Sequence, residues 1–382
     1  MLLILLILIF IRPFISSLAF PYLNLIYSVI LLVFLIVWLI QEGIPIQKLQ
    51  TLQYPLVLFV LALIISSIFS IDKINSLKEI YRYMSGLLIF LTGIYLKDEY
   101  RIRVIKVMVL TGFLISLLAI YQYSFGFRHI LDYLSKEKIS STFALDYIQR
   151  QRVYFPFVTP NILGGYLAMI IPLILALWDK KKKLFLNPFF FFLISVSFAL
   201  LLTKSLGALL SLFLALIIYF YLQGNLDRKR LLFVVGFLII IGLIFLLRHS
   251  VTKQHILPTF SLTMRLNYWI DTLKIIKIAP WQGFGLGNFN LPFTRYAHNS
   301  YLQIWAEMGI LGIISILWLI FVVFKSSLKN IKDSPTKHQI AGLITANAVF
   351  LIHNLVDFSF FLPEINLIWW LILGLTLSLK NS

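Results

Sequence analysis

Long apolar runs separated by short polar links constrain this chain more than any other feature. Of its 382 residues, 60% are hydrophobic and only 13% are charged, which leaves too little polar surface to cover a soluble globular domain. A helix needs roughly 20 apolar residues to cross a bilayer, and about twelve runs qualify. We therefore predict an all-α, polytopic membrane protein that forms a single integral membrane domain over residues 1–382.

The expected spans follow one another closely and leave no room for a separate catalytic domain. The first run lacks the basic start and the cleavage site of a signal peptide, so we expect it to be retained as a span. Arg12 within this run must face protein or the lipid surface. The stretch 70–84 is expected to form a short helix lying on the membrane. The expected spans are Leu2–Phe20, Leu23–Ile40, Pro55–Ser70, Ser85–Leu96, Val104–Tyr121, Ile162–Trp178, Phe189–Leu202, Leu206–Tyr221, Leu231–Leu247, Ser300–Phe324, Ile340–Val356 and Ile365–Leu379.

Lysine and arginine set the expected orientation. The formal net charge is +18, but the basic residues lie in short links, where they meet anionic lipid headgroups rather than nucleic acid. Counting Lys106 at the start of the fifth span with the link before it, the links after the fourth, sixth, eighth and tenth spans hold four, four, three and four of them. We therefore expect these links and both termini in the cytoplasm. The segments Gly126–Pro160, Thr203–Ser205 and Arg248–Ala297 then face outward together.

The outward segment 248–297 is expected to contain an amphipathic helix on the membrane surface. Arg265 lies in this helix, one turn before Trp269. Its planar guanidinium could bind a diphosphate through paired hydrogen bonds, and snorkelling or an ion pair is the structural alternative. The helix is predicted because apolar residues recur at spacings of three and four, namely at Leu262, Leu266, Trp269, Ile270, Leu273 and Ile276.

His298 stands where this segment enters the next apolar run. A neutral imidazole can accept a proton from a sugar hydroxyl, and a helix N-terminus favours the neutral form. A polar anchor at the headgroup level is the structural alternative. We expect Asn299 to cap the helix. Glu307 lies roughly 13 Å deeper along that helix and is expected to fix packing through a polar partner rather than to react.

Several glycines surround these residues. The run Pro280–Gly287 does not follow a strand and lacks the spacing of a dinucleotide-binding loop, so Gly283, Gly285 and Gly287 are expected to form a tight turn with positive φ angles. Gly309 and Gly312 are expected to allow close contact between helices.

Other outward residues could join the site. Arg152 and Lys204 bring positive charge to the same side, and His353 and Asp357 could form either a proton relay or a structural pair. The chain has no cysteine, which excludes disulfides and thiol catalysis. Six scattered histidines and few outward carboxylates argue against a bound divalent metal ion.

Taken together, these motifs resemble those of the O-antigen ligase and polymerase superfamily of bacterial membrane glycosyltransferases. The resemblance rests on His298-Asn299 followed by Gly309 and Gly312, and on Arg265, Trp269 and the Pro280–Gly287 run before them. The family also frequently shows an arginine before a Pro-Asn step, as in Arg152 and Pro160-Asn161. The turn Lys204-Ser205-Leu206-Gly207 looks like the family's Ser-Arg-Gly hairpin, but Leu206 occupies the position of the arginine.

The resemblance implies an enzyme of the bacterial inner membrane with its active site on the periplasmic face. It would use a polyprenyl-diphosphate-linked glycan as donor, without a cofactor or metal ion. His298 would deprotonate the acceptor hydroxyl and Arg265 would neutralise the departing diphosphate. Contacts to substrate would come from Arg152, Lys204, Trp269 and Asn299, with Arg152 or Lys204 replacing the missing arginine.

Three functions remain open at this point. A ligase would transfer the glycan to a lipid A core sugar, whereas an O-antigen or exopolysaccharide polymerase would join lipid-linked repeat units. We favour the ligase, because the histidine motif fits it well. From another class, a transporter or flippase of a lipid-linked glycan would also need many spans and outward arginines, but no inverted repeat or matching pair of interrupted spans is visible. A purely structural membrane partner would leave the outer motif unexplained.

Overall fold

The fold is seen in a computed structural model of the chain. The structure describes residues 1–42, 49–137, 142–178, 187–224, 236–237, 239, 241–243, 260–329, 331 and 336–378. The expected span Leu231–Leu247 and the first part of the expected outward segment lie largely outside these residues.

Helices make up all the named elements within the described residues, so the all-α prediction is confirmed. A π-helical turn at Gln122–Gly126 joins α5 to α6, and short 3₁₀ turns follow α1 and precede α15. The helices are α1 Leu2–Ile11, α2 Pro21–Glu42, α3 Gln53–Ile68, α4 Lys73–Tyr95, α5 Asp98–Tyr121, α6 Phe127–Lys136, α7 Thr142–Gln149, α8 Pro160–Ala176, α9 Pro188–Leu202, α10 Leu206–Gln223, α12 Phe260–Ile278, α13 Ser300–Leu328, α14 Lys337–His353 and α15 Pro363–Ser378.

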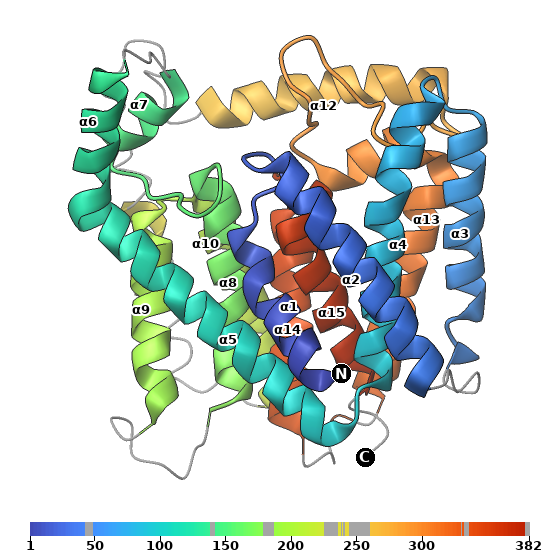
Figure 1. The fold of residues 1–382 in the computed structure, drawn as a ribbon, viewed down its shortest axis with the longest axis horizontal. Coiled ribbons are helices and arrows are strands. Elements are labelled where there is room, and N and C mark those ends of the chain that lie inside the picture. Colours follow the sequence, from blue (N-terminus) through green and yellow to red (C-terminus); the bar gives the residue numbers. More distant parts are fainter. Residues whose placement is uncertain are drawn as a thin grey trace.

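The long helices stand side by side, and α12 lies across one end of them (Figure 1). Among the described elements, α4 packs against α15 and α2, α14 packs against α8 and α10, and α13 packs against α3. The helices α6 and α7 lie at the same end as α12, whereas the N-terminus lies at the opposite end. We call the first of these ends the α12 end.

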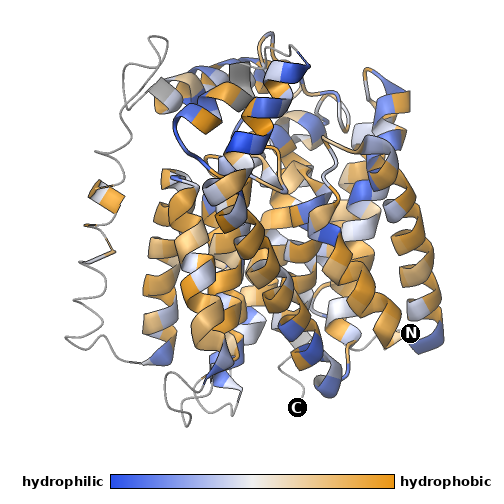
Figure 2. Cartoon of the chain, turned by 60° about the vertical axis from the view of Figure 1, so that its left-hand side comes forward, coloured by the Kyte–Doolittle hydropathy of each residue, from blue (hydrophilic) through white to orange (hydrophobic). Residues whose placement is uncertain are grey.

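The apolar character of the bundle is suited to lipid. Apolar residues fill the middle of the upright helices, and polar residues gather towards their ends (Figure 2). Within the described residues, α2, α10, α13 and the continuous run Glu99–Lys136 are long and apolar enough to cross a membrane. Large apolar side chains such as Ile26 and Phe191 are more than half exposed, as expected for side chains that face lipid.

Most helix boundaries follow the predicted spans, but the stretch 70–84 does not form a separate surface helix. It is the first half of α4, which runs unbroken from Lys73 to Tyr95 after Asp72 caps it through the N–H groups of Ile74 and Asn75. No proline separates the charged stretch from the apolar run, and Gly86 between them does not interrupt the helix, so both join one helix. As a result, Arg82 is carried into the protein interior and is only 7% exposed.

Arg12 faces protein, as predicted. Its side chain is 1% exposed and donates a 2.7 Å hydrogen bond to Asn24 Oδ1. Its Nη2 atom lies 3.4 Å from Glu364 Oε2, and its guanidinium lies over the Tyr27 ring. A buried charge needs such partners, because the apolar interior does not replace its hydration.

The helix α12 confirms the predicted helix but corrects which residues share its outer face. Leu262, Leu266 and Ile270 are 46–53% exposed, whereas Ile276 is 3% exposed. The inner face of α12 carries Arg265 at its start and Ile276 near its end. The apolar residues predicted to share one face therefore lie on two faces of α12. Residues seven or fourteen positions apart do not stay aligned in a helix with 3.6 residues per turn.

The glycine run docks onto a break in α13. Gly309 has φ 67° and ψ −172°, which interrupts the helix. Carbonyl oxygens freed by the break accept hydrogen bonds from the run: Ala306 O from Phe284 N–H at 2.9 Å, and Glu307 O from Gly285 N–H at 3.1 Å. In return, Ile310 N–H donates to the carbonyl oxygen of Pro280. These bonds satisfy backbone groups that a broken helix would otherwise leave without partners.

The glycine conformations agree with the predicted turn and refine the role of α13. Gly283, Gly285 and Gly287 have φ angles of 71°, 99° and 70°, which confirms the turn. A Cβ at Gly309 would overlap with the carbonyl group of Trp281. The close approach at Gly309 is therefore to the glycine run and not to another helix.

Candidate active site

His298 precedes α13 in a strained backbone conformation. Its φ of 51° lies in the left-handed region, which is costly for a residue with a side chain and persists where surrounding contacts hold it. The next residue caps α13: Asn299 Oδ1 accepts hydrogen bonds from the N–H groups of Tyr301 at 3.0 Å and Leu302 at 3.1 Å. The predicted capping role of Asn299 is confirmed, and it fixes the chain beside His298.

Aromatic rings enclose the His298 imidazole. The Tyr268 ring of α12 stacks against it with centroids 5.6 Å apart, and the Phe358 ring meets it edge-on at 4.9 Å. Trp269 Nε1 donates a long hydrogen bond of 3.4 Å to the His298 carbonyl oxygen. Nδ1 of His298 is buried without a hydrogen-bond partner among the described residues. The imidazole is thus held by packing and keeps a nitrogen free for proton transfer.

The start of α13 is tied to the segment after α14, which carries Asp357. Ser300 N–H donates to the carbonyl oxygen of Asn354 at 2.9 Å, and Ser300 Oγ donates to that of Asp357 at 3.1 Å. The Asp357 carboxylate lies 2.9 Å from His353 Nε2 and accepts a hydrogen bond from Ser359. Burial alone would raise the pKa of Asp357, but His353 and Ser359 lower it to about 2. Asp357 therefore carries a negative charge close to His298.

Arg265 approaches this charge from α12. Its half-buried side chain makes no hydrogen bond or ion pair with any other described residue. Burial lowers the pKa of Arg265 and the charge of Asp357 raises it, but an arginine stays protonated in proteins. A cation that is partly desolvated and has its hydrogen-bond donors unused is suited to bind an anionic ligand.

Arg265 and burial keep His298 neutral. Burial lowers the pKa of His298, Asp357 raises it, and the charge of Arg265 lowers it, with a result of about 4. Near pH 7 the imidazole is therefore unprotonated and can accept a proton. The charge of Arg265 repels a proton on His298. An anionic ligand that neutralises Arg265 removes this repulsion, so the pKa of His298 rises and the imidazole becomes a stronger base.

Arg152 and Lys204 form a second basic group between α7 and α10. Arg152 is 5% exposed, and it donates 3.0 Å hydrogen bonds to the Thr203 carbonyl oxygen and to Asn161 Oδ1. Lys204 has a φ of 50° and donates to the Arg150 carbonyl oxygen at 2.8 Å. Burial and the charge of Arg152 lower the pKa of Lys204. Arg152 thus holds the turn together, while the Lys204 ammonium keeps hydrogen-bonding capacity to spare.

Close packing around His353 joins this basic turn to Asp357. A Cβ at Gly165 of α8 would overlap with the His353 ring, and a Cβ at Gly207 of α10 would touch it. The neighbouring Gly164 faces Ser205, which caps α10. These glycines let α8, α10 and α14 converge at the α12 end, which brings three segments far apart in sequence to one place.

The structure brings Arg265, His298, Trp269 and Asn299 together, as the sequence suggests, and places Arg152 and Lys204 in a neighbouring turn. Their roles in catalysis and binding remain predictions. Sequence reasoning missed Tyr268 and Phe358, which enclose His298. Tyr268 follows Arg265 by three residues on one helix face, a signal that could have revealed it, whereas no spacing rule points to Phe358.

Glu307 is held as predicted. It is 1% exposed, accepts a hydrogen bond from Gln303 Nε2 at 2.9 Å and accepts one from the Gly287 N–H at 2.9 Å. The carboxylate therefore fastens the glycine run to α13.

Comparison with known proteins converges on the same motifs. A family model described as O-antigen ligase matches residues 189–317, a range that contains both Arg265 and His298. An O-antigen ligase from Salmonella typhimurium is 26% identical over 316 residues, which covers 74% of this chain and 72% of the relative. These matches confirm the resemblance predicted from the sequence and identify residues 189–317 as carrying the pattern of the O-antigen ligase family in a multi-pass membrane protein.

Proposed function

We propose that this protein is an O-antigen ligase that transfers a glycan from a polyprenyl-diphosphate donor to a lipid A core sugar. The observation that carries the proposal is the meeting of two residues: Arg265, whose guanidinium has no hydrogen bond to another described residue, and His298, a neutral imidazole whose pKa is about 4. Together they offer an anion site and a base side by side. The family match and the similarity to a Salmonella typhimurium O-antigen ligase support this choice.

In the proposed reaction, the donor diphosphate binds Arg265. His298 accepts the proton of the acceptor hydroxyl, whose oxygen attacks the anomeric carbon of the donor sugar. The bond from that carbon to the diphosphate oxygen breaks, and the bonding electrons leave with the diphosphate. Because negative charge on the leaving group grows in the transition state, a fixed guanidinium stabilises that state more than the ground state.

Lys204, rather than Arg152, is the better replacement for the arginine missing at Leu206. Arg152 is enclosed and its guanidinium already bonds Thr203 and Asn161. Within the described residues Lys204 donates one hydrogen bond, to the Arg150 carbonyl oxygen, and an ammonium has three donors. We propose that Lys204 assists Arg265 in binding the diphosphate and that Trp269 and Asn299 contact the substrate beside it.

The proposed orientation puts the α12 end on the periplasmic face of the inner membrane and both termini in the cytoplasm. The basic residues that the sequence places in the links after the fourth, sixth, eighth and tenth predicted spans favour this direction under the positive-inside rule. A donor presented outside the cytoplasm would then reach Arg265 from the membrane surface, with its polyprenyl tail among the apolar helices.

Transfer by the purified protein tests the proposal. Wild type in detergent or liposomes is given polyprenyl-diphosphate-linked glycan and lipid A core acceptor, with EDTA present, beside His298→Ala and Arg265→Ala. Wild type is expected to form the product, and each variant is expected to lose at least about a hundredfold in rate, because a positioned base contributes roughly 10²–10⁴-fold and a fixed charge that stabilises the transition state roughly 10²–10³-fold.

Two control variants separate chemistry from general damage. His129→Ala removes an exposed histidine of α6, and Lys274→Ala removes an exposed cation of α12 that pairs with Asp271. Both should retain wild-type transfer. Elongation of the donor glycan without use of the core acceptor would assign a polymerase instead. Movement of the intact lipid-linked glycan between leaflets, without either product, would replace the enzyme assignment with a transporter.

A further inference from the structure

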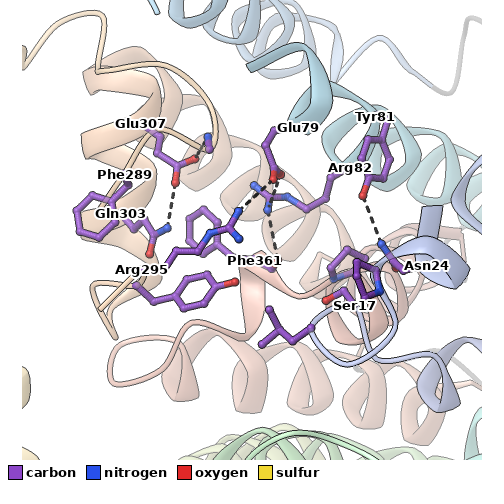
Figure 3. Close-up of a pocket in the computed structure, with 15 residues that line it drawn as sticks. Ser17, Asn24, Glu79, Tyr81, Arg82, Phe289, Arg295, Gln303, Glu307 and Phe361 are labelled. Carbon is purple, nitrogen blue, oxygen red and sulfur yellow. Dashed lines mark hydrogen bonds and ion pairs between the residues drawn. The ribbon is translucent and has the colours of Figure 1, made fainter. Parts of the chain in front are cut away.

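A polar pocket lies beside the candidate active site, between α4, the link from α1 to α2, and the segment before α13 (Figure 3). Its volume is about 160 Å³. A second hollow of about 470 Å³ shares Glu79, Gly287, Phe289 and Arg295 with it. We call the two together the α4 cleft. None of the residues assigned above to the reaction lines it.

The charges in the α4 cleft are mixed. Arg82 is 7% exposed, and its Nη1 lies 2.7 Å from Glu79 Oε2. It also donates to the Phe361 carbonyl oxygen at 3.3 Å, while its Nε and Nη2 are buried without a well-formed hydrogen bond to another described residue. Arg295 is 63% exposed, with Nη2 3.9 Å from Glu79 Oε1. Opposite charges that face one another in this way are poorly suited to a polyanion, because each bound phosphate would also meet a carboxylate.

The same arrangement is suited to an uncharged sugar. Every sugar hydroxyl can both donate and accept a hydrogen bond, and the wall of the cleft alternates guanidinium donors with carboxylate and amide acceptors. The rings of Phe289, Tyr296 and Phe361 also line it, and they offer apolar surface for the C–H groups of a pyranose ring. A concave site with a few convergent polar groups and aromatic walls is the usual form of a small-ligand site.

One layer of aromatic rings connects the α4 cleft to His298. Tyr296, which lines the cleft, stacks on Phe358 with ring centroids 4.1 Å apart and planes 11° apart. Phe358 also meets the His298 imidazole edge-on at 4.9 Å. The cleft therefore lies on the Tyr296 side of this stacked pair, and His298 lies on the Phe358 side, together with Tyr268 and Arg265 of α12.

We propose that the α4 cleft binds the acceptor sugar of the transfer reaction, as an uncharged, hydroxyl-rich saccharide. The inference rests on the proposed function, because the acceptor is the second substrate of the proposed reaction. It assigns the donor diphosphate to Arg265 and the acceptor to Arg295, Arg82 and Glu79, so that the two substrates enter from different sides of His298.

The kinetics of Arg295→Ala in the full-length protein test this assignment. Because Arg295 is 63% exposed, its replacement leaves the fold intact. With saturating polyprenyl-diphosphate-linked glycan, the KM for lipid A core acceptor is expected to rise about tenfold, which corresponds to the loss of roughly one strong hydrogen bond. The KM for the donor and kcat should change less than about twofold, since neither depends on the affinity for acceptor. Arg295→Lys should recover part of the loss, and Arg128→Ala, at an exposed arginine of α6, should match wild type.

Direct binding separates this inference from the proposed function. Acceptor oligosaccharide freed of its lipid, and the repeat oligosaccharide of the donor, are titrated calorimetrically into wild type and Arg295→Ala. Arg295-dependent binding of either saccharide supports the cleft as a sugar site even if wild type transfers no glycan, in which case only the proposed function fails. If wild type transfers glycan and Arg295→Ala has an unchanged KM for the acceptor, the assignment of the α4 cleft to the acceptor is wrong and the proposed function still stands. Arg295-dependent binding of inorganic diphosphate alone makes the cleft an anion site and also overturns the inference.

Discussion

Gln303 accepts a hydrogen bond from the Ala297 backbone N–H at 3.1 Å, immediately before His298. The same side chain donates to Glu307 through Nε2. A residue one turn inside α13 therefore fixes the backbone of the residue before the candidate base, and the proton acceptor is positioned through the main chain.

Replacing Gln303 should slow glycan transfer without weakening the binding of the donor. In Gln303→Ala the buried Ala297 N–H loses its acceptor, which costs about 1–3 kcal/mol and lets the backbone before His298 move. We expect kcat to fall about tenfold while the KM for the donor stays within about twofold. Steady-state transfer assays measure both. Gln303→Glu keeps an acceptor for Ala297, so a loss as large as that of the alanine variant would count against a positioning role through this hydrogen bond.

The pKa of His298 should move in opposite directions when its two charged neighbours are removed. Arg265 lowers this pKa and Asp357 raises it. Arg265→Gln is therefore expected to raise it above the wild-type value of about 4, and Asp357→Asn is expected to lower it. Titration of ¹³C-labelled histidine by NMR in detergent, with the His298 signal assigned by its absence from His298→Ala, measures all three values. Shifts of the same sign would contradict the arrangement of charges.

The pH profile of the free enzyme follows from the same shift. Protonated His298 cannot accept the hydroxyl proton, so kcat/KM should fall as the pH drops through about 4 and should stay level where the imidazole is already neutral. An unperturbed histidine would instead lose activity below its ordinary pKa of 6.5. Measurement of kcat/KM at constant ionic strength distinguishes the two profiles. An acid limb centred near 6.5 would show that His298 is not held neutral by its surroundings.

The cap of α13 should contribute measurable stability. Asn299 Oδ1 accepts the N–H groups of Tyr301 and Leu302, and replacement of an Asn cap by alanine costs about 0.5–2 kcal/mol. Asn299→Ala should therefore lower the thermal midpoint in detergent, followed by circular dichroism. Asn299→Asp and Asn299→Ser keep a cap and should stay near wild type in stability. If both capping variants retain stability but lose transfer, Asn299 also contacts substrate.

Gly309 should tolerate no side chain. Its φ of 67° disfavours other residues, and a Cβ would overlap with the Trp281 carbonyl group. We expect Gly309→Ala to destabilise the protein by about 3 kcal/mol or more, since strain and the loss of docking of the glycine run add together. Gly242→Ala is the matched control because a Cβ there meets nothing within 4 Å. Equal thermal midpoints for the two variants would show that α13 can close without the break.

The sequence predicts the upright helices well, because the length of an apolar run is enough to predict a membrane-spanning helix. The boundaries of α9 and α14 fall close to the expected spans, and the positive φ angles of the glycine run follow from residue type. The sequence does not predict the break at Gly309, since a glycine within an apolar run is compatible with an unbroken helix as well. It depends on the Pro280–Gly287 run arriving from outside, which no local pattern reports.

The α4 cleft could not be assembled from spacing. Glu79 and Arg82 lie more than 200 positions before Arg295 in the chain, and only the folded bundle brings them together. A local signal did exist: no proline separates the charged stretch of α4 from the apolar run, and the single Gly86 between them is compatible with one continuous helix. Charges carried into a bundle in this way are expected to have partners or a function.

The hydrogen bonds of Phe284, Gly285 and Pro280 to the break in α13 are made by main-chain atoms of the glycine run. None of these bonds uses the side chain of Gln282 or Phe284, whereas Gly283, Gly285 and Gly287 are needed for their positive φ angles. Gln282 and Phe284 are therefore free to vary without undocking the run. Side chains of the run can therefore change, and with them the surface that meets a saccharide, while the main-chain hydrogen bonds to α13 stay the same.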